Sequence, residues 1–240
     1  MSCWNQRGRI LGMLTITGAS LIAAACGSAA PQVVPSPLED GVLEFASGRD
    51  STDLQNNEAA RLIPESTYQS TETQVPFRFT LPESDRLWQG VWEDEWSAAI
   101  VFSIEGVVND PPALVLSVAE EGSTPEGVAD AMRSSTPEFA WEQSSGLFEG
   151  RDAIVLEATT NRDSLEEQLG PGVADLIFLS TGDASNFGVS VADDRSYRSQ
   201  IFEEQGRVVI VTIDFATGIE AEVTAEVAPV LASLEIRGAS

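Results

Sequence analysis

The chain has 240 residues, 42% of them hydrophobic, and its formal net charge is −25 at pH 7. So acidic a chain lacks the basic surface of nucleic-acid-binding proteins and is repelled by anionic lipid headgroups. It contains no histidine and no lysine, which excludes Ser-His-Asp and Cys-His catalysis, imidazole metal sites, P-loops and Schiff-base lysines.

The first 25 residues have the layout of a signal peptide, because Arg7 and Arg9 precede a short apolar run from Ile10 to Ile22. A membrane-spanning helix needs roughly 20 apolar residues, and this run is shorter and interrupted by glycines. We therefore predict export followed by cleavage, with residues 1–25 removed.

The signal ends in Leu21-Ile22-Ala23-Ala24-Ala25-Cys26-Gly27, which resembles the lipobox of bacterial lipoproteins. The resemblance implies that diacylglycerol is attached to the Cys26 sulfur, and that Cys26 anchors the mature chain at the extracytoplasmic face of the cell membrane. Cys3, the only other cysteine, would leave with the signal, so the exported chain would have no disulfide and no free thiol. The alternative is an ordinary secretory signal with an incidental cysteine.

Residues 26–74 are rich in Ser, Pro, Asn, Asp, Glu and Thr, a composition typical of a lipidated N-terminus followed by a flexible linker. As a coil, the linker would span roughly 40 Å and lift a domain clear of the lipid surface. A short helix is a candidate over residues 53–63. We expect one globular domain over residues 75–240.

Hydrophobic alternation predicts the first strands of this domain over residues 75–81, 88–103 and 113–118. Thr124-Pro125-Glu126 then has the composition of a helix N-terminus, since it offers a capping hydroxyl, a preset proline and an acid that complements the helix dipole. This helix should end near Ser134, because Pro137 cannot continue it.

The second half is predicted to contain strands over residues 141–156, divided by a turn at Gly150, and over 175–180, 187–191 and 207–215. The last of these is apolar on both faces and should lie at the centre of a sheet. A closing helix is indicated by apolar residues at four-residue spacing, with a kink or restart at Pro229 and a short element over 234–236. The apolar residues are Ile219, Val223, Val227 and Leu231.

This order of elements predicts an α+β fold with helices packed on an antiparallel or mixed sheet. The strand Phe77-to-Pro82 with Trp88, the Gly150 turn, and the strand 207–215 leading into Pro229-to-Leu234 are similar to PsbP-like and LpqN-type lipoprotein domains. The resemblance covers about residues 75–236. It implies an α/β/α sandwich and a non-enzymatic role, and it carries no functional residues over to this chain.

Trp88, Trp92 and Trp96 are the candidate ligand site, because four-residue spacing predicts that all three lie on one side of the backbone. Glu93 and Glu95 are interleaved with them. Indole faces beside carboxylates suit a cation or a sugar ring. The alternative is that one or two of the rings fill the core while the acids line a solvated edge.

No spacing selects a catalytic carboxylate pair or a calcium loop, so the sequence assigns no catalytic residue, no metal ligand and no cofactor. We expect a lipid-anchored extracytoplasmic module that binds a solute or an envelope protein, without nucleic-acid binding or enzymatic activity. The alternatives are a passive envelope scaffold and, less favoured, a hydrolase built from two carboxylates.

Overall fold

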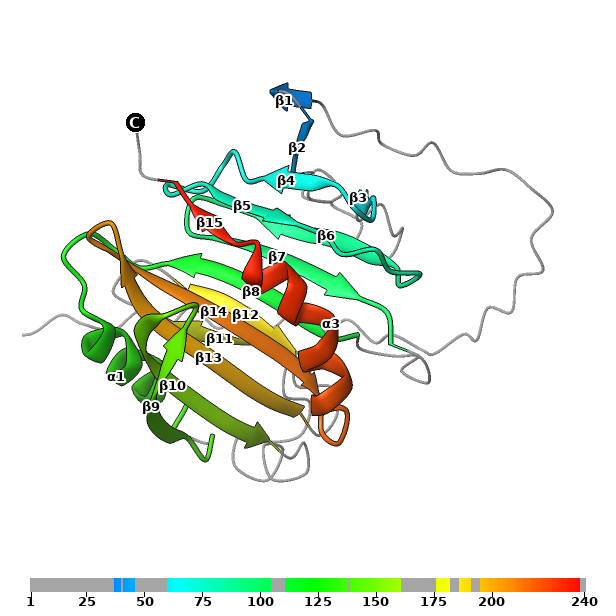
Figure 1. Cartoon of the computed structure of the whole chain (residues 1–240). Coiled ribbons are helices and arrows are strands. Elements are labelled where there is room, and N and C mark those ends of the chain that lie inside the picture. The colour runs from blue at the N-terminus through cyan, green and yellow to red at the C-terminus, as the bar shows by residue number, and fades with distance from the viewer. Residues whose placement is uncertain are drawn as a thin grey trace, which may run out of the picture. The chain divides into compact units, whose positions relative to one another are not determined.

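Two β-sheets, a separate hairpin and two helices make up the described part of the chain (Figure 1). The structure is a computed structural model that describes residues 37–39, 41–45, 60–104, 111–137, 139–160, 176–181, 186–190 and 195–237. These residues all belong to the compact unit Gln32–Ser240. The predicted α+β class is confirmed.

The larger sheet has eight strands, and every neighbouring pair is antiparallel. From one edge to the other its strands are β3 (Ala60–Leu62), β6 (Trp88–Glu93), β7 (Ser97–Phe102), β8 (Ala113–Val118), β14 (Arg207–Ala216), β13 (Arg195–Glu204), β10 (Arg151–Thr160) and β9 (Glu142–Phe148). All residues of β14 from Val208 to Phe215 are buried, which confirms the predicted central strand.

The smaller sheet has five strands and is mixed, because β2 and β4 run parallel while its other pairs are antiparallel. In spatial order its strands are β1 (Pro37–Glu39), β2 (Val42–Glu44), β4 (Thr67–Gln69), β5 (Phe77–Thr80) and β15 (Glu235–Ile236). The strands β11 (Leu176–Ser180) and β12 (Asn186–Ser190) form the separate hairpin.

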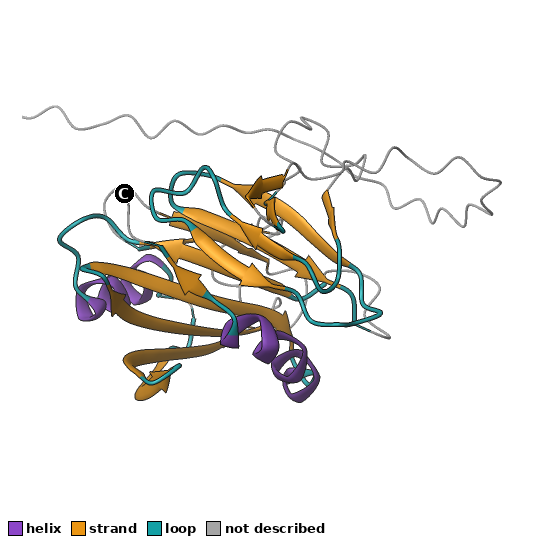
Figure 2. Ribbon diagram, turned by 45° about the horizontal axis from the view of Figure 1, so that its top comes forward, coloured by secondary structure: helices purple, strands orange, loops and turns teal. Residues whose placement is uncertain are grey.

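The eight-stranded sheet is covered on both faces, and each face has its own apolar core. Alternate residues of β14 divide between them, with Val209 in the core shared with the five-stranded sheet and Val208 in the other. Helix α3 (Glu220–Ala232) packs into the first core and α1 (Pro125–Ser135) into the second. The helices therefore lie on opposite faces, as an α/β/α sandwich requires, and the five-stranded sheet is an additional layer beside α3. Figure 2 shows both helices lying against the strands.

The helix ends follow local chemistry. At the start of α1, the Thr124 hydroxyl accepts a hydrogen bond from the Gly127 N–H at 3.1 Å, which confirms the predicted cap. Helix α3 runs without a restart through Pro229, whose side chain is exposed. The short element after it is β15, which pairs with β5.

The folded part of the chain begins before Val75, so the predicted domain boundary is too late. Four strands, β1 to β4, lie within the range assigned to the linker. Three residues are too few to produce recognisable alternation, although the segment places Phe45, Leu62 and Tyr68 in the first core. Tyr68, fully buried, accepts a 2.6 Å hydrogen bond from the Ile63 N–H. Of the helix considered over residues 53–63, residues 60–62 are a strand and 53–59 lie outside the described residues.

The sequence analysis did not predict strand β13, although it has ten residues and lies in the interior of the sheet. Its inward-facing side includes Arg195 and Ser199, both fully buried, so apolar and polar residues do not alternate along it. Burial of polar side chains here depends on partners in neighbouring strands, which one strand's sequence does not reveal.

Candidate functional site

The lipidation site at Cys26 lies outside the described residues and stays a prediction. In the part of the chain that the structure describes, no helix has the length and apolar character to cross a membrane.

The three tryptophans do not share one side of the backbone, contrary to the sequence prediction. Trp88 pairs with Phe102 and lies fully buried in the core beneath the five-stranded sheet, with the two ring centres 4.6 Å apart. The β6–β7 register then shifts between Gly90 and Trp92, as in a β-bulge. Because a one-residue shift moves a side chain to the other face, Trp92 pairs with Ala99 and packs on the α1 side of the sheet.

The indole N–H groups of Trp92 and Trp96 each donate a hydrogen bond to a nearby side chain. Trp92 Nε1 donates to the Ser97 hydroxyl at 3.1 Å, and Trp96 Nε1 donates to the Glu95 carboxylate at 2.9 Å. Trp96 lies in the turn between β6 and β7 and is partly buried against the first core. The rings therefore form no shared indole face, which was the premise of the predicted ligand site.

Glu93 joins the two sheets. Its side chain is 2% exposed, and its carboxylate accepts hydrogen bonds from the Thr71 and Glu72 N–H groups at 2.6 and 2.7 Å. Both donors lie in the connection between β4 and β5. Burial raises the pKa of Glu93, and the backbone N–H donors counteract part of that effect. Glu95 is exposed, and its carbonyl accepts from the Gln74 N–H of the same connection at 2.8 Å.

An open hollow of about 590 Å³ lies beside β9 at the start of α1. We call it the β9 hollow. Its only cationic side chain, Arg151, is paired with Glu204, so the lining presents excess negative charge. The lining residues are Pro125, Glu126, Ser145, Gly146, Arg151, Asp152, Ala153, Ile154, Ile201 and Glu203.

A second hollow, of about 320 Å³, is lined by residues of β9, β10 and β13, by Ala140, by Phe215 of β14 and by the first residue of α3. Glu142 and Glu157 lie directly opposite each other in the β9–β10 pair, an arrangement that destabilises a sheet. Arg198 offsets part of this repulsion, since it lies 3.3 Å from the Glu157 carboxylate. Glu220 adds a third carboxylate, so this hollow also favours cationic groups.

A buried polar row crosses β13 and β14 on the α1 face, and the sequence analysis did not identify it. Arg195 is 0% exposed and bonds Asp214 through both Nε and an Nη atom at 2.6 Å. Next to this ion pair, the hydroxyls of Ser199 and Thr212 share a 2.8 Å hydrogen bond. The only hint in the sequence is Asp214, an acid within an otherwise apolar strand. A buried ion pair of this kind indicates either a contact that specifies the fold or a functional site.

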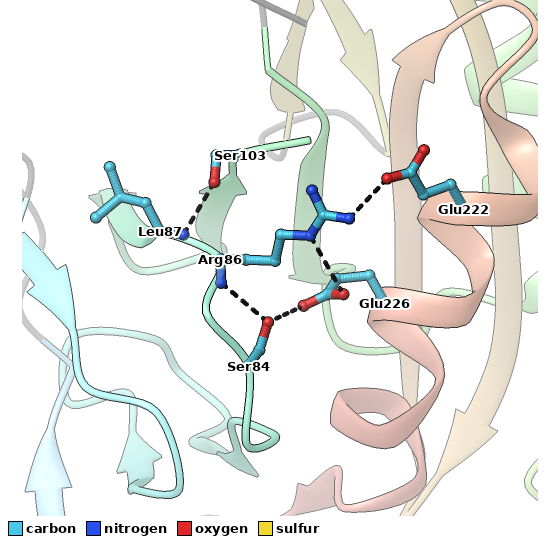
Figure 3. Close-up of polar contacts among 6 residues, drawn as sticks. All are labelled: Ser84, Arg86, Leu87, Ser103, Glu222 and Glu226. Atoms are coloured by element: carbon cyan, nitrogen blue, oxygen red, sulfur yellow. Dashed lines mark hydrogen bonds and ion pairs between the residues drawn. The ribbon is translucent and has the colours of Figure 1, made fainter. Parts of the chain in front are cut away.

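The segment before β6 is fastened to α3 by a more exposed polar cluster (Figure 3). Arg86 lies 2.7 Å from the Glu222 carboxylate and 3.9 Å from that of Glu226, and the Ser84 hydroxyl donates to Glu226 at 2.7 Å. Arg86 is paired with both acids, so the cluster links this segment to α3 and offers no free cation to a ligand.

The acidic side chains are not arranged as a metal centre in the described part of the chain. Among those residues, no group of three or more His, Cys, Asp or Glu could hold a metal ion. What the geometry does offer is two hollows with excess carboxylates, both suited to binding cationic groups.

Comparison with known proteins identifies no family, because no family model and no curated protein matches the chain. Three solved structures show partial similarity. LpqN of Mycobacterium tuberculosis, described as involved in cell envelope biogenesis, is 13% identical, with a TM-score of 0.39 over 80% of this chain and 98% of that protein. CyanoP, the PsbP protein of the cyanobacterium Synechocystis, is 11% identical, with a TM-score of 0.35 over 67% of this chain and 86% of that protein.

The third structure is a protein from Bacteroides thetaiotaomicron, which is 14% identical with a TM-score of 0.36 over 68% of this chain. This chain spans 45% of the Bacteroides protein's length. The chain is thus structurally similar, at low identity, to both kinds of protein that its sequence resembles. At this level the likeness assigns it no ligand, partner or activity.

Proposed function

We propose that the chain is an extracytoplasmic lipoprotein that is anchored through Cys26 and acts by binding, without catalysing a reaction. The observation that carries the proposal is the processing signal, in which Arg7 and Arg9, a short apolar run and small residues precede Cys26. The bound species would be a solute or another protein of the cell envelope.

Charge supports a covalent anchor rather than electrostatic docking. Removing the signal takes Arg7 and Arg9 from the chain and no acid, so the formal charge falls from −25 to about −27. A domain of that charge is repelled by anionic headgroups, whereas each buried CH₂ of an acyl chain contributes about 0.8 kcal/mol to membrane attachment.

The first strand lies closer to the anchor than the sequence prediction implied. Between Cys26 and Pro37, the first residue of β1, the fully extended chain reaches at most about 40 Å. The folded unit would therefore stay within this distance of the membrane, where it would meet other anchored proteins.

Binding is favoured over catalysis by what the described residues bring together. The two hollows contain carboxylates, one partnered arginine each, and hydroxyl groups, with no activated nucleophile beside a base. Such linings suit recognition of cationic groups by charge and hydrogen bonding.

Processing at Cys26 is tested by expressing the full chain in a bacterial host that processes lipoproteins and determining the mass of its N-terminal peptide. We expect a diacylated peptide that begins at Cys26 and a chain that fractionates with membranes. Cys26→Ala should abolish the modification, while Cys3→Ala, the matched control within the signal, should leave it intact. An unmodified Cys26, or a mature chain that begins elsewhere, would refute the proposal.

A further inference from the structure

Strand β9 forms one edge of the eight-stranded sheet, and no described strand pairs with its outer side. All seven of its residues pair with β10, and the register is continuous from Phe148 opposite Arg151 to Glu142 opposite Glu157. An edge strand presents a row of N–H and C=O groups that a further strand can pair with. The register shows that no bulge interrupts this row along the strand.

The features by which proteins usually protect a sheet edge are missing from β9. Short strands, prolines, bulges and charged side chains discourage edge pairing. In β9 the only charged residue is Glu142 at its start, and it contains neither proline nor a bulge. At the other edge, β3 has only three residues and carries Arg61 at its centre. The two edges therefore differ, and among the described residues β9 is the edge that offers a full-length row of N–H and C=O groups for pairing.

The side chains of β9 leave room for a neighbouring strand. Gln143, Ser144 and Ser145 are exposed, and Gly146 has no side chain. Leu147 is 66% exposed, more than any other large hydrophobic residue in the described part of the chain. It provides an apolar contact for a strand added alongside, while the small residues before it let the backbones approach.

The acidic side chains around β9 favour an added strand that carries basic side chains. Side chains of an added strand would point alternately to the two faces, and those on the α1 side would lie at the mouth of the β9 hollow. There they would meet the carboxylates of Glu126, Asp152 and Glu203, all exposed. A net charge of −25 disfavours a second copy of this chain in the same place.

We propose that β9 binds an extended, basic segment of a partner protein by β-strand addition, with cationic side chains at alternate positions over the β9 hollow. Main-chain hydrogen bonds to β9 supply affinity, and the carboxylates of the hollow supply selectivity. This inference rests on the proposed binding function and names the class of partner.

A synthetic peptide of about ten residues, in which valine and lysine alternate, is a suitable probe. Its binding to the folded chain is measured by fluorescence anisotropy, with two comparison peptides of the same length. One replaces lysine by glutamate, and the other replaces alternate valines by proline, which removes strand-forming N–H groups. We expect the lysine peptide to bind at least about tenfold more tightly than either, and to bind less tightly as salt is raised.

Two proline variants test the main-chain contact. Neighbouring residues of a strand direct their N–H groups to opposite sides, so only one of Gln143→Pro and Ser144→Pro removes an outward N–H. The variant that retains the wild-type unfolding midpoint is the informative one, and it should bind the lysine peptide about tenfold less tightly.

A double variant, Asp152→Asn with Glu203→Gln, tests the charge. It should weaken binding of the lysine peptide several-fold and leave a threonine-for-lysine peptide unaffected. The matched control is Glu65→Gln with Glu235→Gln, two exposed acids outside the hollow, which alters the net charge equally. Equal loss in both double variants would refute a local role for the hollow.

Three results would overturn the inference. Failure of the lysine peptide to bind would refute it, while acylation at Cys26 would still support the proposed function. Equal binding of the proline peptide would exclude strand addition. A concentration-dependent doubling of mass in sedimentation, abolished by the informative proline variant, would show that a second copy occupies the edge.

Discussion

Two buried carboxylates in the described part of the chain are compensated in different ways. Glu93 lies at the end of β6, and the backbone N–H groups of Thr71 and Glu72 bind its carboxylate. Asp214 lies in β14 and is bound by the guanidinium of Arg195. Both carboxylates are 2% exposed, so burial alone does not distinguish them.

The difference determines what happens when one partner is removed. Neutralising Asp214 leaves a full positive charge on a side chain with no solvent exposure, whereas neutralising Glu93 leaves only backbone dipoles without an acceptor. It also determines the response to pH, because the raised pKa of Glu93 brings its ionisation closer to the neutral range. The following predictions use this contrast.

The largest effect is expected for Asp214→Ala, which should lower the free energy of unfolding by about 3–5 kcal/mol, because the fully buried guanidinium of Arg195 loses the Asp214 carboxylate. Urea unfolding measures it. Arg195→Met with Asp214→Leu removes both charges and should cost much less. If the double variant were as unstable as Asp214→Ala, loss of the ion pair with Arg195 would not be the cause.

Glu93→Ala should cost about 1–3 kcal/mol, since it leaves the Thr71 and Glu72 N–H groups without their acceptor. The same urea experiment applies, with Glu95→Ala as the control, because the carbonyl rather than the carboxylate of Glu95 contacts the β4–β5 connection. Equal stability of Glu93→Ala and wild type would mean that Glu93 does not fasten the two sheets together.

Glu93→Gln should reveal the pH dependence. A raised pKa means that the folded state binds the proton more tightly than the unfolded state does. The stability that Glu93 contributes is therefore fully present below the ordinary glutamate pKa, and it is lost as pH rises through the raised folded value. The unfolding free energy of the wild type, relative to that of Glu93→Gln, should fall as pH increases from about 4 to 8. A difference that rises with pH would show that the N–H donors outweigh burial.

The smallest effect is expected at the partly exposed pair of Arg86 and Glu222, with side chains 25% and 43% exposed. A double-mutant cycle with alanine at both positions should give a coupling free energy of about 0–1 kcal/mol, because solvent screens the pair. A coupling as large as that at Arg195 and Asp214 would mean that burial does not set the strength of these contacts.

Much of the fold could be predicted from single-element patterns. Strand β8 begins and ends at the predicted residues, β14 is the expected central strand, and Thr124 caps α1. In each case one short segment contains the whole signal, either apolar residues on both faces or a capping hydroxyl followed by proline.

The rest depends on contacts between segments. A single bulged residue moves Trp92 to the face opposite Trp88, and the spacing of tryptophans does not encode that bulge. Arg195 of β13 is buried and forms an ion pair with Asp214 of β14. The Glu93 carboxylate accepts hydrogen bonds from N–H groups about twenty residues earlier in the chain. The prediction of a tryptophan site was therefore wrong because its geometry depended on strand register. The only local signal of the polar row was Asp214, and the two hollows had none.

The pairing of β15 with β5 has a consequence for how the molecule is made. Thr80 and Ser233, which meet beside this pair, are 153 residues apart in the chain. During synthesis β5 can pair with β4 at once, but its other edge stays without a neighbour until β15 has been made. A pairing between segments so far apart in the chain slows folding, because a long loop must close before the contact forms.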